Sequence, residues 1–142
     1  MGIRNIMPVL IAIVFAVTFG FTPGAFAGNL QFMPLKDTPK ATGTIQLGKD
    51  SLKISANGLK ADSVYTVWFV NKKPKMQKAG AGNAPYMFKT DSAGKGSYDA
   101  SLSASPFGKW GMVMVVRHPT GNPKDMDNKV GAFAAKIPKT AR

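Results

Sequence analysis

The sequence contains no cysteine and no glutamate, and His118 is its only histidine. Without cysteine the chain can form neither a disulfide bond nor a thiolate nucleophile, and a blue-copper centre is excluded because it needs a cysteine ligand. A serine nucleophile needs a base, and no carboxylate that could orient His118 lies nearer in the sequence than Asp125. We therefore expect a protein that is not an enzyme and carries no cofactor.

A metal site is also not expected, although His118 shares one segment with Asp125 and Asp127. One imidazole and two carboxylates can hold zinc, but three ligands from one flexible loop are uncommon. A copper- or zinc-binding periplasmic protein centred on His118 remains an alternative. Thioethers are soft ligands for copper(I), but Met112 and Met114 lie in an apolar run, where methionine usually fills core space.

No segment shows convincing helical periodicity, and the apolar residues instead follow the two-residue period of β-strands. Leu52–Asn57 alternates cleanly between apolar and polar residues. Ser63–Val70 is apolar on both faces, and Trp110–Pro119 contains the unbroken apolar run Met112–Val116. Such short runs are typical of strands at the centre of a sheet.

The pattern predicts an all-β fold, a seven-stranded antiparallel immunoglobulin-like β-sandwich with Greek-key connections. Asn71–Pro85 is rich in glycine and lysine and is expected to be one long loop. The expected strands are Thr42–Leu47, Leu52–Asn57, Ser63–Val70, Tyr86–Thr90, Ser97–Ser103, Met112–Val116 and Val130–Ile137.

The N-terminus has the features of a signal peptide. Arg4 precedes a long apolar stretch, and Ala25-Phe26-Ala27 forms a cleavage motif before Gly28. An uncleaved membrane anchor is the alternative, but the apolar stretch is short for a span. We expect a secreted or periplasmic protein, cleaved between Ala27 and Gly28, without a stable membrane anchor afterwards. The expected parts are a signal peptide (1–27), an arm (28–41), the sandwich domain (42–138) and a basic tail (139–142).

Three segments carry a resemblance to a known family. LKISANGLKADSVYTVWFV (52–70), the DSAGKG turn (91–96) and VMVVRHPTGNP (113–123) resemble the extracytoplasmic β-sandwich domain of anti-sigma-K factors and similar small exported immunoglobulin-like proteins. The resemblance covers Leu47 to Ile137 and implies the sandwich fold. It does not imply the function, because the family's sigma-binding helices and lasting membrane anchor are missing.

Positive charge dominates the composition, with a net charge of +12. If successive strands alternate in direction, three connections meet at one end of the sandwich, where Asp50 is the only acid. Gly80-Ala81-Gly82 also offers backbone N–H groups to an anion. This end collects six lysines, which are Lys49, Lys72, Lys73, Lys75, Lys78 and Lys109.

These features predict a non-catalytic exported binding module that contacts an anionic surface, an envelope polysaccharide or an acidic protein. The alternative is a solvated, mobile loop whose lysines maintain solubility. Nucleic acid is not expected as a partner, because no aromatic residues interleave with the lysines.

The apolar strands also predict a covered outer sheet face. Either Val64, Trp68 and Val70 or the alternate residues of the same strand would face outward. Monomeric proteins rarely leave such a patch open. The cover could be an ordinary loop, a second subunit in a homo-oligomer, or the arm with Leu30, Phe32, Met33 and Leu35. The last two make a structural or assembly subunit an alternative function.

Overall fold

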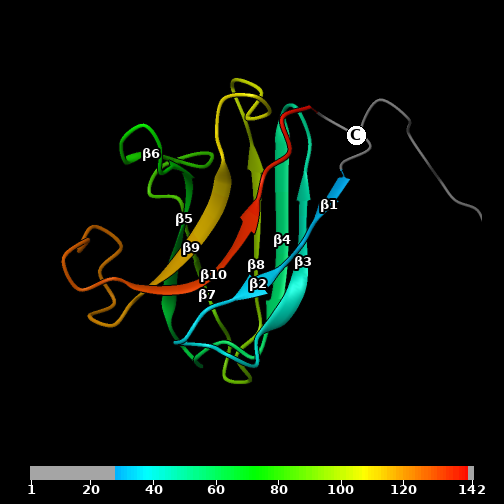
Figure 1. The fold of residues 1–142 in the computed structure, drawn as a ribbon. Helices are drawn as coiled ribbons and strands as arrows, with labels where there is room; N and C mark the ends of the chain where they lie inside the picture. The colour runs from blue at the N-terminus through cyan, green and yellow to red at the C-terminus, as the bar shows by residue number, and fades with distance from the viewer. Residues whose placement is uncertain (1–27, 141–142) are drawn as a thin grey trace, which may run out of the picture.

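The computed structural model describes residues 28–140, which form ten β-strands in two antiparallel sheets and no helix (Figure 1). Within these residues, no helix has the length and hydrophobicity needed to span a bilayer. The expected signal peptide lies outside the described residues, as do the last two residues of the tail. The all-β, sandwich-like architecture predicted from the sequence is confirmed.

The smaller sheet has four strands in the order β1-β3-β4-β8. They are β1 (Gly28–Leu30), β3 (Thr42–Leu47), β4 (Ser51–Asn57) and β8 (Gly96–Ser101). The larger sheet has the order β2-β10-β9-β5-β6, and β7 also pairs with β5. They are β2 (Met33–Pro34), β5 (Val64–Asn71), β6 (Gln77–Gly80), β7 (Met87–Lys89), β9 (Met112–His118) and β10 (Val130–Lys136).

The core lies between the two sheets. Alternation in β4 buries Leu52, Ile54 and Ala56 against residues of β5 and β9. The two strands predicted to be central are β5 and β9, and they pair with each other inside the six-stranded sheet. Burial of both faces explains why these two strands are the most apolar in the chain.

The prediction that Asn71–Pro85 is one long loop is wrong, because it contains β6. Residues 77–80 pair with residues 68–71 of β5, so the hydrogen-bonding edge at the end of β5 is occupied. Glycine and lysine are depleted in strands, and this composition concealed β6 in the sequence. Residues 28–140 contain three strands more than predicted, namely β1, β2 and β6.

The arm lies against its own chain and joins the two sheets at one open side (Figure 1). β1 pairs with β3 in one sheet, and β2 pairs with β10 in the other. Between them, the ring of Phe32 stacks on the buried ring of Phe133 with centroids 4.5 Å apart. The arm therefore seals the edge of the core.

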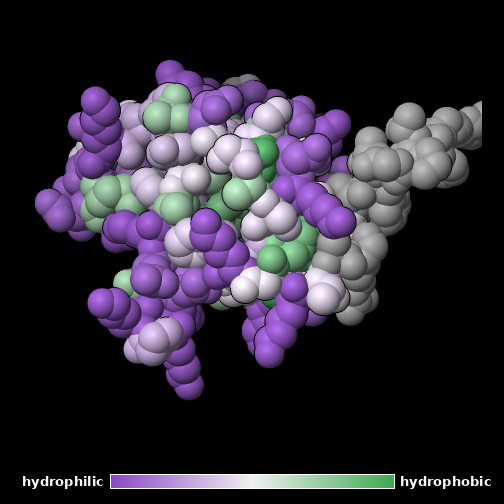
Figure 2. All heavy atoms as spheres, turned by 90° about the horizontal axis from the view of Figure 1, so that it is seen from above, coloured by the Kyte–Doolittle hydropathy of each residue, from purple (hydrophilic) through white to green (hydrophobic). Residues whose placement is uncertain are grey.

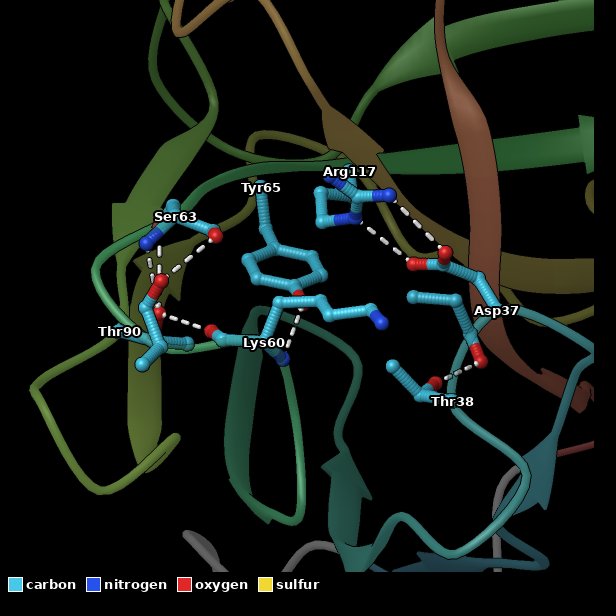
Figure 3. A network of polar contacts seen from close by, with 9 residues as sticks. Asp37, Thr38, Lys60, Ser63, Tyr65, Thr90 and Arg117 are labelled. Atoms are coloured by element: carbon cyan, nitrogen blue, oxygen red, sulfur yellow. Dashed lines mark hydrogen bonds and ion pairs between the residues drawn. The ribbon is translucent and has the colours of Figure 1, made fainter.

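An ion pair ties the arm to β9 (Figure 3). Arg117 donates from Nε to Asp37 Oδ2 at 2.8 Å and from Nη2 to Asp37 Oδ1 at 3.0 Å. The hydrogen bond and charge of Arg117 lower the pKa of Asp37 below its usual value. Nearby, Thr38 Oγ1 donates to the carbonyl of Ala132 at 2.7 Å. These contacts fasten the part of the arm that follows β2 to β9 and β10.

Candidate anion-binding end

Three connections meet at one end of the molecule, toward the top of Figure 1. They are the β3–β4 turn, the β5–β6 hairpin and the β8–β9 connection. The amide of Leu102 donates to the carbonyl of Asp50 at 2.8 Å, which ties the first connection to the third. Asn71 Nδ2 donates to the carbonyl of Lys109 at 2.8 Å, and Gly111 N donates to Asn71 Oδ1 at 2.7 Å. These two bonds tie the second connection to the third.

These connections carry Lys49, Lys72, Lys73, Lys75 and Lys109, and all five side chains are exposed. With Lys78 they make up the lysine-rich end. Among the described residues, none of these six lysines forms an ion pair. Their charges therefore remain available to a partner.

Lys78 lies outside the turn between β5 and β6, although the sequence places it in the same loop as Lys72, Lys73 and Lys75. It belongs to β6 opposite Val70, and its Nζ lies 5.8 Å from the centroid of the Trp68 ring. This cation–π contact places Lys78 at the side of the six-stranded sheet. It belongs to the margin of the lysine-rich end.

Lys139 lies at this end and was missed in the sequence, where it counted as part of the tail. Its carbonyl oxygen lies next to Gly108, 3.3 Å from the position that a Cβ would take there. Residues 137–139, which follow β10, therefore return to the β8–β9 connection. Only this long-range packing shows it.

Gly80-Ala81-Gly82 does not present its backbone to an anion, contrary to the sequence interpretation. The Ala81 amide donates to Val67 O at 3.0 Å, and Tyr98 Oη donates to the Ala81 carbonyl at 2.6 Å. The ring of Tyr86 occupies the space where a side chain on Gly80 would lie. Here glycine permits close packing.

Two hollows open at or beside this end. The larger has a cavity volume of about 490 Å³, and its lining includes the apolar residues Leu30, Leu47, Phe107 and Ile137 together with Lys136. The smaller has a volume of about 170 Å³ and is lined by Phe69, Lys109 and Trp110 among others. Figure 2 shows this end as a hydrophilic rim around paler, more apolar surface.

His118 lies elsewhere, on the outer face of the six-stranded sheet, and is only 2% exposed. Its Nδ1 lies 3.0 Å from the carbonyl oxygen of Asp125, which can only accept, so Nδ1 carries the proton. Its Nε2 lies 2.7 Å from Thr66 Oγ1, and in the neutral ring protonated at Nδ1 it accepts from that hydroxyl. Thr66 Oγ1 in turn accepts from Trp68 Nε1 at 2.7 Å. Both ring nitrogens are therefore engaged.

The three candidate metal ligands do not converge in the structure. The carboxylate of Asp125 accepts hydrogen bonds from Asn128 and Thr120, which lower its pKa. It is the Asp125 backbone that contacts His118. Within residues 28–140, no three histidine, aspartate or glutamate side chains are grouped so that they could hold a metal ion.

Comparisons with protein-family models, curated proteins and solved structures find no match for this chain. The fold and the charge distribution alone describe the protein, as a small β-protein of two sheets with a lysine-rich end.

Proposed function

We propose that this chain is a non-catalytic binding module that contacts an anionic partner through the lysine-rich end. The observation that carries the proposal is the convergence of exposed lysines on three connections that hydrogen bonds hold together. Asp50 is the only acid on the same connections. A surface of this kind attracts polyanions over several ångströms and needs no catalytic group.

An acidic polysaccharide of the cell envelope is the partner that we favour. Lysine ammonium groups are compact point charges, which suit repeated carboxylates along a flexible polymer better than one bidentate anion. The apolar side chains that line parts of the two hollows would contact the less polar faces of the sugar rings. Export by a signal peptide cleaved between Ala27 and Gly28 is part of this proposal, because it brings the chain to the envelope.

We also propose that seven of the strands, namely β3, β4, β5, β7, β8, β9 and β10, form an immunoglobulin-like Greek-key sandwich. The strand orders β3-β4-β8 and β10-β9-β5 support this arrangement. β7 pairs with β5, whereas in constant-type immunoglobulin domains the corresponding strand extends the other sheet. The resemblance to the sandwich domain of anti-sigma-K factors belongs to the same proposal.

Two charge-matched variants test the function. In the first, Lys72, Lys73, Lys75 and Lys109 become Gln. In the second, four exposed lysines outside the three connections become Gln, namely Lys60, Lys89, Lys95 and Lys124. Binding to a defined acidic polysaccharide such as alginate is measured by calorimetry at low salt. We expect the first variant to lose most of its affinity and the second to keep most of it. Equal losses would contradict a localised site.

A further inference from the structure

Three methionines lie on the outer face of the six-stranded sheet, and two of them flank one small residue. Ala134 of β10 pairs with Met114 of β9 on one side and with Met33 of β2 on the other. Met112 precedes Met114 by two residues and therefore lies on the same face. None of the three methionines belongs to the hydrophobic core, so the expectation that Met112 and Met114 fill the core is wrong.

The burial of Ala134 shows that neighbouring side chains cover it, and Met33 and Met114 are its direct cross-strand neighbours on the outer face. Ala134 is only 2% exposed although it lies on the outer face, while the three methionines are each half-buried. Adjacent strands lie about 4.8 Å apart, so the Cα atoms of Met33 and Met114 are separated by roughly 10 Å. Two methionine side chains are long enough to span that gap.

An aromatic ring lies next to this cluster. Trp68 of β5 pairs with Met114 and is half-buried. Its indole Nε1 donates a hydrogen bond to Thr66 Oγ1. The same hydroxyl is also hydrogen-bonded to His118 Nε2. A face of the ring already attracts a cation, the ammonium group of Lys78.

We propose that Met33, Met112 and Met114 form a binding site for a soft monovalent metal ion, copper(I), beside the Trp68 ring. Neutral thioethers coordinate soft ions and offer little to zinc, calcium or magnesium. Lys136 lies opposite Met112 and Lys78 lies over Trp68. Their charges repel any cation, but they repel a divalent ion about twice as strongly as a monovalent one. This site uses neither His118 nor the hairpin of the lysine-rich end.

The test uses the purified protein without a histidine tag, with silver(I) as a redox-inert probe and copper(I) under anaerobic, reducing conditions. We expect one equivalent to bind, the methyl resonances of Met33, Met112 and Met114 to shift, and tryptophan fluorescence to fall. Met76 is 65% exposed in the β5–β6 hairpin and serves as the internal control, with an unshifted resonance.

Variants that conserve side-chain volume separate binding from packing. The double variant Met112→Leu/Met114→Leu is expected to lose stoichiometric binding, while Met76→Leu binds as the parent protein does. Met33→Leu, at a sheet edge, provides a second test if the double variant fails to fold, and it is expected to weaken binding. The proposal is overturned if the parent protein takes up neither ion, if Met76 shifts as much as the cluster, or if Met33→Leu and the double variant bind normally. Zinc(II) binding of equal affinity at the same residues would also overturn it.

Discussion

The hydroxyl of Thr66 joins two side chains on the outer face of the larger sheet. It donates to His118 Nε2 and accepts from Trp68 Nε1, and the residue is fully buried. Replacement by valine keeps the shape but leaves both nitrogens without a partner. We expect Thr66→Val to lower the free energy of unfolding by about 2 kcal/mol, because buried polar groups lose their hydrogen bonds.

Urea denaturation measures this change, with Thr44→Val as the matched control. Thr44 is an exposed strand residue on β3, so its replacement is expected to alter stability by less than about 0.5 kcal/mol. If Thr66→Val unfolds at the same urea concentration as the parent protein, the hydroxyl does not hold the two rings.

The ion pair between Asp37 and Arg117 predicts a pH dependence of stability. The pKa of Asp37 is lowered in the folded state from 3.8, chiefly by the Arg117 hydrogen bond. Its stabilising contribution is therefore complete above the unfolded-state pKa and is lost as the pH falls through the lower folded-state pKa.

Asp37→Asn should cost about 2 kcal/mol at neutral pH, since hydrogen bonds to charged groups are stronger than neutral ones. The stability difference between parent and variant should shrink steadily below about pH 4. Chemical denaturation at several pH values measures it. A difference that stays constant into strong acid would show that the carboxylate charge has no role.

The residue types in the sequence did not indicate the contact between Thr66 and His118 or the ion pair between Asp37 and Arg117. His118 stood out in the sequence as the only histidine, but its hydrogen-bond partner Thr66 lies 52 positions away. Asp37 and Arg117 are 80 positions apart. The strand register brings such pairs together, and a single sequence does not give that register.

At the scale of elements, hydrophobic alternation located the strands that bury a face in the core. β3 has the predicted bounds, and β4, β5 and β10 differ from them by one residue at one or both ends. β1, β2 and β6 were missed because each has at most four residues and contains glycine or proline, which are depleted in strands. They are held by pairing with an existing sheet edge.

Gly82 illustrates how an element is packed against its neighbour. Its φ is +113°, and a Cβ there would lie 2.5 Å from Ala100 Cβ and 2.8 Å from Tyr98 Oη. Gly82→Ala therefore adds a clash to the conformational strain. Gly121 has a φ of +81° with nothing within 4 Å of its Cβ position, so Gly121→Ala measures strain alone.

We expect Gly121→Ala to cost about 1 kcal/mol, as alanine does at positive φ, and Gly82→Ala to cost clearly more. Thermal unfolding of both variants provides the comparison. Equal losses would mean that residues 80–82 move to relieve the clash, and would contradict the close packing described for this segment.

At the scale of the whole molecule, the sequence predicted which connections share an end. Alternation of strand direction was enough for that prediction, because every pairing is antiparallel. It could not show that Lys139 returns to this end or that Lys78 lies over Trp68. It also could not assign the three methionines to one face, because that depends on the pairing of β2 with β10.

The central proposal, attraction of a polyanion by the lysine-rich end, is tested most directly by the salt dependence of binding. Affinity for alginate is measured from about 50 mM to about 500 mM sodium chloride, a range over which surface charges become screened. We predict that the parent protein and the Lys60, Lys89, Lys95 and Lys124 variant lose affinity steeply. The Lys72, Lys73, Lys75 and Lys109 variant should bind weakly, with a shallow dependence on salt. Parallel curves for all three proteins, or binding by the parent protein that salt leaves unchanged, would contradict the proposal.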